Sequence, residues 1–396
     1  MRLLLGALLA VHGLIHLIGA AKAFGIAQVP QLLQPISRPA GTLWLIAALL
    51  QLATVFGLLA WPKWWWVIGA VAAVVSQALI TSSWSDAKYG TVANVILLIA
   101  AAYGYLSNRH GSFQAQYDRA IAENTRQSSA LPVLTDADLA HLPRVVQKYV
   151  RASGAVGQPR VRNVRARMRG KIRGAPAEPW MKFTAEQFNT FGDYQSSGAH
   201  PSRFFLMKAT KAGLPIEALH VFRDGSATMR VKLASLVTVA DAAGAEMNRG
   251  ETVTVLNDMF LLAPATLVTS DIRWEEIDAK SARATLVYAG QTISAKVTFA
   301  ESGELTDFDS VDRLRSSPDG KTFQQTRWTT PVAEYRDFGP TRLWSTGEAR
   351  WHPTEGEFAY GRFELRSIEY NIGMANSTNQ VASRLAMTRI GERASA

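Results

Sequence analysis

The 396-residue sequence predicts a four-helix transmembrane segment followed by an α+β domain, built on a curled, half-barrel-like antiparallel β-sheet with covering helices. Charge is distributed unevenly, because the first 110 residues carry only seven of the 42 Lys and Arg and 32 Asp and Glu side chains. The same part contains four apolar stretches, and from about residue 161 the hydrophobic period changes from helical to two. One part therefore has the composition of a membrane segment and the other that of a water-soluble domain.

Each of the four apolar stretches is long enough to cross a bilayer, which takes about 20 apolar residues. They cover residues 3–21, 41–61, 64–82 and 89–106. Only Pro62 and Lys63 separate the second from the third, between tryptophans typical of membrane interfaces. These two stretches should form an antiparallel hairpin. We predict a transmembrane domain over residues 1–106 and a connector over 107–134, which begins as a helix leaving the membrane.

The first stretch has some features of a signal peptide, with a short basic start and an A-x-A-like site at Ala21–Ala23. Its apolar run is longer than a usual signal core, so an uncleaved helix is predicted. Four spans place both termini on one side. Basic residues near the spans number five on that side and three on the other, namely Arg2, Lys63, Arg109, Arg119 and Arg126 against Lys22, Arg38 and Lys88. This excess predicts an integral membrane protein with a cytoplasmic soluble domain, which in a bacterium means the inner membrane.

His12 and His16 lie four residues apart and therefore on one helix face. Ionisable groups inside a membrane are costly, so the pair could ligate haem or a metal, or handle protons. The alternative is hydrogen bonding to neighbouring helices, and the other stretches contain no second histidine pair. We favour hydrogen bonding, as for Gln51, Gln77 and Asn94, and predict no cofactor.

Residues 135–372 are predicted to form the antiparallel sheet domain, and residues 373–396 a polar C-terminal tail. Alternating apolar and polar residues, separated by turn signals such as Asp224-Gly225, are typical of strands buried on one face. One helix is expected from Thr135 or Asp136 to about Ala152, and another over 250–267. About ten strands are expected, some of them fused, over residues 162–173, 180–188, 203–210, 216–223, 227–239, 272–277, 282–289, 292–300, 304–315, 322–330, 341–352 and 357–371.

A long antiparallel meander tends to curl, and its concave face must be covered. The helix over 250–267 could cover it and leave an apolar groove, or side chains could fill the space completely. Where a groove exists, it would suit a hydrophobic ligand. The candidate ligand-binding residues are Trp180, Phe183, Val253, Leu256 and Phe260, the last three on the apolar face of the helix.

A basic stripe occupies alternate positions of the first predicted strand, at Arg165, Arg167, Arg169, Lys171 and Arg173. On a strand these five side chains would project from one face. The stripe could contact anionic lipid headgroups, where each charge is worth about 1 kcal/mol. The alternative is an exposed face with partners such as Glu186 on the next strand. Nucleic acid is a poorer partner, because neither a recognition helix nor an aromatic platform accompanies the stripe.

Catalytic and metal-binding motifs are missing from the sequence. The protein has no cysteine, which excludes thiol nucleophiles and cysteine-ligated metals. It has no H-E-x-x-H, G-x-S-x-G or phosphate-binding glycine motif. Asp307 and Asp309 could hold a divalent cation with Asp312, but we expect them to form a solvated strand edge that pairs with Arg313 or Arg315. The missing motifs do not exclude an enzyme, but they remove every specific reason to propose one. We therefore favour a non-catalytic protein without a metal site, with His12 and His16 as weak metal candidates.

Several scattered motifs resemble an uncharacterised bacterial family, the domain of unknown function 6544. They are Leu142-Pro143…Tyr149…Gly154, Trp180-x-x-Phe183-x-Ala185-x-Gln187 and Asp224-Gly225, with compatible residues at Pro264, Trp274, Arg313, Gly339-Pro340, Trp344 and Tyr370. The segment His12-Gly13-Leu14-Ile15-His16-Leu17 is similar to the membrane lead-in of some members. The resemblance covers most of residues 135–372 and implies no activity. The family's β-rich shape is in turn similar to lipoprotein-carrier half-barrels.

Three functions remain open from the sequence. The first is a membrane-anchored binding module for a lipid or another hydrophobic ligand, with membrane lipids as partners. The second is a structural or assembly protein, whose sheet domain is fully packed and whose four helices bind a membrane-protein partner. The third is a membrane redox protein that uses His12 and His16.

Overall fold

The computed structural model describes residues 2–125, 131–191, 201–269, 271–317 and 321–373. The chain divides into two compact units, residues 1–115 and 116–396. The predicted C-terminal tail lies, apart from residue 373, outside the described residues.

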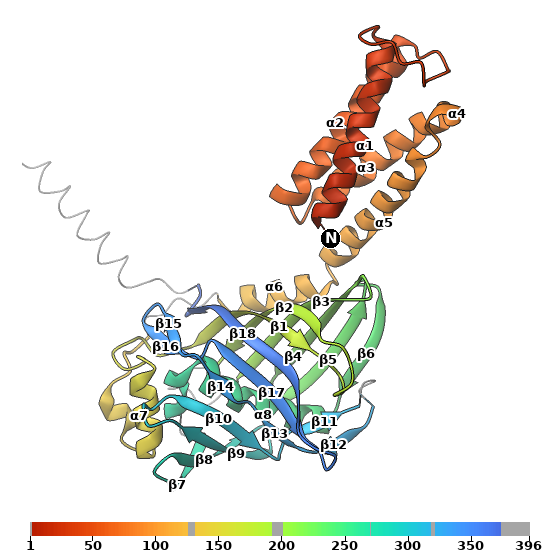
Figure 1. Ribbon diagram of the computed structural model, residues 1–396. Helices are drawn as coiled ribbons and strands as arrows, with labels where there is room; N and C mark the ends of the chain where they lie inside the picture. The colour runs from red at the N-terminus through yellow and green to blue at the C-terminus, as the bar shows by residue number, and fades with distance from the viewer. Residues whose placement is uncertain (1, 126–130, 192–200, 270, 318–320, 374–396) are drawn as a thin grey trace, which may run out of the picture. The chain divides into compact units, whose positions relative to one another are not determined.

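The first unit is a bundle of apolar helices, four of them long and apolar enough to cross a membrane (Figure 1). Its helices are α1 (Arg2–Ala23), α2 (Arg38–Ala60), α3 (Trp65–Ser82), the short α4 (Trp84–Ala87) and α5 (Gly90–Asn108). Helix α1 packs on α2, α2 on α3 and α3 on α5. Small residues permit this packing, since a Cβ atom at Gly19 would lie 2.7 Å from the ring of Trp44. The short link between α2 and α3 forms the expected hairpin.

The second unit is built on one large antiparallel sheet. Its fourteen strands run in the order β6-β5-β4-β3-β2-β1-β18-β17-β13-β10-β9-β8-β7, with β14 paired to β17. These strands are β1 (Asn163–Ile172), β2 (Met181–Thr190), β3 (Ser202–Lys211), β4 (Leu214–Arg223), β5 (Ser226–Leu233), β6 (Val237–Ala243), β7 (Ile272–Asp278), β8 (Ser281–Tyr288), β9 (Gln291–Phe299), β10 (Leu305–Ser310), β13 (Arg327–Thr329), β14 (Val332–Ala333), β17 (Thr346–His352) and β18 (Phe358–Tyr370). Two small pairs accompany them, β11 (Leu314–Ser316) with β12 (Phe323–Gln325) and β15 (Arg336–Phe338) with β16 (Thr341–Leu343).

The sheet is curled but open. Strands β6 and β7 are its two edges in the strand order and are not paired with each other among the described residues. The curl brings the β4–β5 turn against the β8–β9 turn, where a Cβ atom at Gly225 would lie 2.4 Å from that of Ala289. The rings of Phe222 and Tyr288 lie 5.9 Å apart at the same place. Strands from opposite halves of the sheet therefore meet, as the half-barrel prediction requires.

Helix α8 (Ala245–Leu262) lies inside the curl and is buried along almost its whole length (Figure 1). The 3₁₀ helix η2 (Pro264–Val268) follows it. A second 3₁₀ helix, η1 (Asp136–Leu139), and α7 (Arg144–Ala152) contribute Leu139, Val146 and Tyr149 to the main core. Helix α6 (Phe113–Asn124) spans the boundary between the two units.

Five predicted elements are divided in the structure. The single helix over 135–152 is divided into η1 and α7, because Pro143 has no N–H group to continue the helix. The strand over 227–239 is divided by a turn at Ala234 and Ser235, both with positive φ, which their residue types do not signal. The strand over 304–315 is interrupted after Ser310. The strand over 322–330 is divided into β12 and β13, and the strand over 341–352 into β16 and β17. The described residues form eighteen strands, more than the ten or so that the pattern predicts.

Candidate ligand-binding cavity

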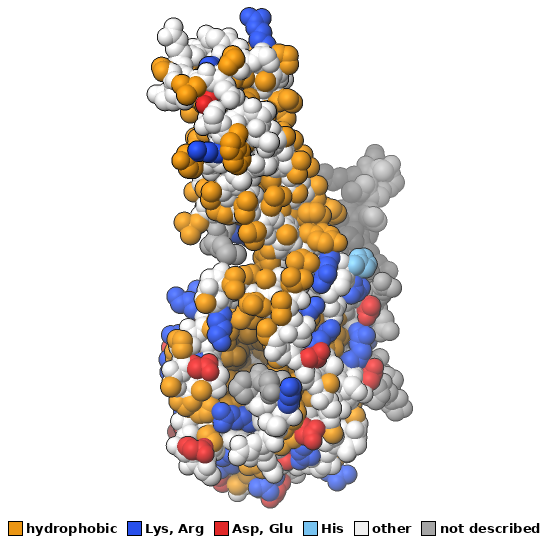
Figure 2. Space-filling view, turned by 90° about the vertical axis from the view of Figure 1, so that its right-hand side faces the viewer, with side chains coloured by type: hydrophobic (Ala, Val, Ile, Leu, Met, Phe, Trp, Pro, Cys, Tyr) orange, Lys and Arg blue, Asp and Glu red, His pale blue; other side chains and the backbone are white. Residues whose placement is uncertain are grey.

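A cavity of about 920 Å³ lies between the concave face of the sheet and helix α8. Apolar and aromatic side chains supply most of its wall. The side of the molecule that carries β6 shows hydrophobic side chains gathered around a hollow (Figure 2). Val237 and Val239 of β6 are about half exposed, and Val239 lines the cavity. The sheet domain is therefore not fully packed.

One region of the cavity, the methionine end, is formed by Met168, Met181, Phe183, Met207 and Met229. Strand register explains part of this grouping, because Met168 of β1 and Met207 of β3 both pair with the same residue of β2, Ala185. Alternating side chains of neighbouring strands share a face, so both methionines point inward. The thioethers are flexible and polarisable, which suits an apolar ligand of variable shape.

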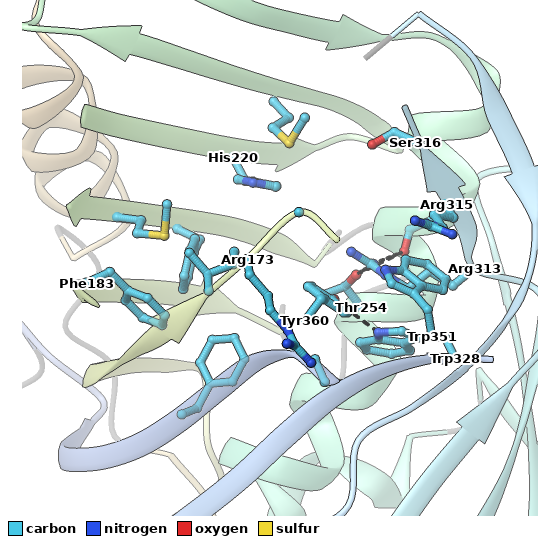
Figure 3. Close-up of a pocket in the computed structure, with 18 of the residues that line it drawn as sticks. Arg173, Phe183, His220, Thr254, Arg313, Arg315, Ser316, Trp328, Trp351 and Tyr360 are labelled. Atoms are coloured by element: carbon cyan, nitrogen blue, oxygen red, sulfur yellow. Dashed lines mark hydrogen bonds between the residues drawn. The ribbon is translucent and has the colours of Figure 1, made fainter. Parts of the chain in front are cut away.

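The opposite region, the arginine end, is formed by Arg313, Arg315, Trp328, Trp351 and Tyr360 (Figure 3). The guanidinium of Arg313 lies 4.6 Å from the ring centre of Trp328 and 6.0 Å from that of Trp351. Trp351 stacks on Tyr360 at 5.6 Å, and the Trp328 Nε1–H donates to the Tyr360 hydroxyl. Aromatic rings thus hold the plane of the Arg313 guanidinium.

A buried ion cluster forms part of the cavity wall between α8 and strand β3. Arg203 donates from Nε to Asp258 at 2.8 Å and from Nη1 to Glu251 at 3.0 Å. Gln187 and Asn189 of β2 donate to the same Asp258 oxygen at 2.7 and 2.9 Å. All five side chains are buried, so this cluster fastens α8 to the sheet through charge-assisted hydrogen bonds.

Ionisation in the cluster follows from burial and from Arg203. Burial opposes the charged form of Glu251, but the charges of Arg203 and Arg313 and a contact with His220 outweigh it and hold the Glu251 pKa well below its ordinary value. Burial raises the pKa of Asp258, against the opposing charge of Arg203. Glu251 is therefore the carboxylate of the cluster that stays ionised.

The predicted ligand-binding residues fall into two groups. Trp180 and Phe183 line the cavity. Val253, Leu256 and Phe260 do not, and lie fully buried in the main core. Expecting these three in the groove was wrong, because α8 is buried on every side. Its apolar face packs into the core, and its polar face, with Glu251, Thr254 and Asp258, points into the cavity.

The basic stripe is divided in the structure. Arg165 pairs with Glu186 at 2.5 Å, Arg167 lies 3.5 Å from Glu369, Arg169 pairs with Glu364 at 2.7 Å, and Lys171 is exposed. Glutamates of the flanking strands β2 and β18 thus neutralise three of these charges.

Arg173 departs from the expectation that five side chains share one face. It follows the last residue of β1 and lines the cavity, where its guanidinium lies 4.5 Å from the ring centre of Trp180. Its Nε donates to the carbonyl oxygen of Ala359 at 2.9 Å, and this bond redirects the side chain.

His12 and His16 join a hydrogen-bond network inside the helix bundle. His16 Nε2 lies 2.9 Å from the Ser76 hydroxyl, and His12 Nε2 lies 3.1 Å from the Asn94 side-chain oxygen. Asn94 donates onward to Gln77 at 3.0 Å. Polar side chains of α1, α3 and α5 therefore satisfy one another, while both side-chain amide atoms of buried Gln51 have no partner among the described residues.

Two of the three aspartates considered for a cation site pair with arginines, although not with the expected Arg313 or Arg315. Asp309 pairs with Arg327 at 2.8 Å, and Asp312 pairs with Arg249. Within the described ranges, no group of three or more His, Asp and Glu side chains is placed to hold a metal ion.

A family model matches residues 132–363, more than half of the chain, and is described as a family of unknown function, DUF6544. The chain belongs to this family. No curated protein matches the DUF6544 chain.

Two solved structures resemble the chain at 10% sequence identity. One is a domain of a putative outer membrane lipoprotein-sorting protein from Vibrio parahaemolyticus, with a TM-score of 0.32 over 55% of this chain and 88% of that one. The other is a LolA superfamily protein from Nitrosomonas europaea, with a TM-score of 0.28 over 57% and 93%. The half-barrel description of this DUF6544 chain rests on the strand order and the curl described above.

Proposed function

We propose that this chain is a membrane-anchored, non-catalytic binding module whose sheet domain encloses a lipid or another hydrophobic ligand. The cavity of about 920 Å³ carries the proposal, because its wall is mainly apolar and aromatic. That volume falls within the roughly 300–1,000 Å³ typical of small-molecule sites. Apolar surface transferred from water into the cavity would supply the affinity, at roughly 25 cal/mol per Å².

The four apolar helices support the anchoring part of the proposal. The excess of basic residues near the same end of the spans favours a cytoplasmic sheet domain in a bacterial inner membrane. A reporter fused after Ala396 tests this orientation. Activity of a reporter that functions only in the periplasm would overturn it.

Contact between anionic headgroups and the part of the basic stripe outside the cavity, Arg165 to Lys171, is a weaker part of the proposal. Glu186, Glu364 and Glu369 already pair with its arginines. Reversing Arg167 and Arg169 to glutamate should reduce binding of the purified protein to anionic vesicles but leave cavity binding intact. Unchanged vesicle binding would remove headgroup contact from the proposal.

Mass spectrometry of organic extracts from the full-length protein in detergent tests the binding function. We expect a stoichiometric hydrophobic compound that is depleted in Met207→Gln, because this substitution places an amide in the methionine end. Met259→Gln is the matched control, since Met259 is equally apolar and buried but does not line the cavity.

Two outcomes would contradict the proposal. One is equal retention of the compound in both variants, which would place it outside the cavity. The other is an empty, stable and monodisperse protein that binds no added lipid probe. That second outcome would favour an assembly role, with a membrane-protein partner for the helices.

A further inference from the structure

We propose that the cavity ligand is an anionic amphiphile, whose phosphate or carboxylate binds at the arginine end while its apolar chain lies in the methionine end. The inference rests on the proposed binding function and names the chemical class of its ligand. It follows from three features of the cavity wall: arginines without matching carboxylates, an unsatisfied buried donor, and the separation of charge from apolar surface.

The first feature is an excess of guanidinium over carboxylate at the arginine end. Arg315 forms no ion pair among the described residues, and its guanidinium lies 5.1 Å from the ring centre of Phe358. Within the described ranges, Arg313 has one carboxylate within 4 Å, Glu251 at 3.8 Å, and that carboxylate is already held by Arg203 at 3.0 Å. The positive charge of this pair is therefore only weakly compensated.

Arg173 adds a third guanidinium to the cavity wall, between the methionine end and the arginine end (Figure 3). The ring of Phe358 faces Arg315, the carbonyl oxygen of Ala359 accepts from Arg173, and Tyr360 stacks on Trp351 beside Arg313. Three consecutive residues of β18 thus contact Arg315, Arg173 and the aromatic neighbour of Arg313, and all three arginines line the cavity (Figure 3).

The second feature is the orientation of Arg313. Its Nη1 donates to the carbonyl oxygen of Gly250 at 2.8 Å and to the hydroxyl of Thr254. Its Nε is buried and has no hydrogen-bond partner among the described residues. A buried donor without a partner costs free energy, which an acceptor from a ligand would recover. A phosphate or carboxylate suits this donor, because a guanidinium can bind either one with two parallel hydrogen bonds.

The third feature is the separation of the two ends. Phe183 lies on one side of the cavity, Arg313 and Arg315 lie on the other, and Arg173 lies between them (Figure 3). Two of the other carboxylates on the cavity wall have partners of their own. Glu348 pairs with Arg350 and Arg362, and Glu178 accepts from the Gly174 N–H. A neutral lipid would leave the guanidiniums without a counter-charge, and a cationic one would be repelled.

Binding assays on the full-length protein in a non-ionic detergent test this inference. The probes form two pairs with the same chain length: a fatty acid with its methyl ester, and a lysophosphatidic acid with the corresponding monoacylglycerol. Displacement of a fluorescent neutral lipid reports the affinity of each. We expect each anionic probe to bind at least about tenfold more tightly than its neutral partner, as a hydrogen bond to a charged group provides. The fatty-acid pair reports on a carboxylate headgroup and the lysophosphatidic-acid pair on a phosphate headgroup. The pair that shows the larger preference for its anionic member identifies the headgroup.

Arg315→Gln should reduce that preference about tenfold and leave the affinity for neutral probes unchanged. Arg327→Gln is the matched control, because Arg327 is half exposed, pairs with Asp309 and does not line the cavity. Arg313→Lys is a second variant that keeps the charge but loses the planar guanidinium, so it should weaken the binding of the anionic probes. Thermal unfolding of this variant should show that the fold persists.

The results separate this inference from the proposed function. Equal affinity for anionic and neutral probes, or the same loss in Arg327→Gln as in Arg315→Gln, would overturn the anionic headgroup and leave a hydrophobic binding module. Failure of all four probes to bind would instead overturn the proposed function.

Discussion

Replacing Arg203 by methionine should destabilise the sheet domain strongly at neutral pH. The guanidinium is 9% exposed and contacts Asp258 at 2.8 Å and Glu251 at 3.0 Å. Methionine keeps much of the side-chain volume but leaves both buried carboxylates without their cation. Removing one partner of a buried ion pair typically costs about 3–5 kcal/mol. That cost is a large fraction of the roughly 5–15 kcal/mol by which a typical protein is stable.

The same substitution should change the pH dependence of stability. Arg203 holds the pKa of Glu251 below its ordinary value, so its loss lets burial raise the pKa values of both carboxylates. A carboxyl whose folded-state pKa exceeds its unfolded value binds more protons in the folded state. Such a group makes the folded state more stable as pH falls. The deficit of Arg203→Met relative to the natural protein should therefore shrink between pH 7 and pH 5.

Urea unfolding of the full-length protein in detergent, followed by tryptophan fluorescence, measures both effects. Adding Glu251→Gln and Asp258→Asn to Arg203→Met should recover more than half of the loss, because the two buried carboxylates that Arg203 neutralised are then gone. Arg327→Met is the control for an exposed ion pair and should cost no more than about 1 kcal/mol. A deficit below about 1 kcal/mol for Arg203→Met, or one independent of pH, would refute the assignment of this cluster as the attachment of α8 to the sheet.

Two further predictions concern buried polar and backbone positions. Burial, and then the neighbouring Asp309, raise the pKa of Asp307 to about 6, so this group makes the folded state less stable as pH rises from about 4 to 6. Asp307→Asn should remove that decline in stability, which is worth up to about 3 kcal/mol. Urea unfolding at several pH values measures it, and a difference from the natural protein that does not change with pH would contradict this prediction. Gly154 has a φ of +72°, and a Cβ atom there would lie 2.4 Å from the carbonyl oxygen of Pro340. Gly154→Ala should therefore lower the melting temperature more than Gly339→Ala, where φ is +66° but nothing lies within 4 Å. Equal shifts of the two melting temperatures would show that the positive φ, and not the contact with Pro340, determines the loss of stability.

Much of the architecture is determined locally and can be predicted from the sequence. Four long apolar stretches require helices in a membrane, and the observed helices agree with them within a few residues. Alternating patterns predict most strands, because each strand is buried on one face. Breaks in the pattern were predicted less well, at Pro143 and at the turn through Ala234 and Ser235.

Trp180 and Phe183 could be named as candidate lining residues from a predicted strand, although strand parity alone left open which face each of them takes. Arg203, Glu251 and Asp258 could not, since 48 and 55 residues separate the arginine from its two partners. Local periodicity has no signal for such pairs. Sequence could still have marked Glu251 and Asp258 as unusual, because a helix expected to be buried carries two acidic residues.

The sequence by itself determined the location of most helices and strands, though not their breaks, and which part of the chain is apolar enough for a membrane. The tertiary structure alone decided which face of α8 meets the cavity, because a helix buried on every side has no solvent-facing stripe to set its orientation. It also decided that Arg173 leaves the basic stripe for the cavity wall, where a carbonyl of β18 and the ring of Trp180 hold it. Hydrophobic burial acts on each segment through its own pattern, whereas hydrogen bonds and ion pairs act between segments that only the curl of the sheet brings together.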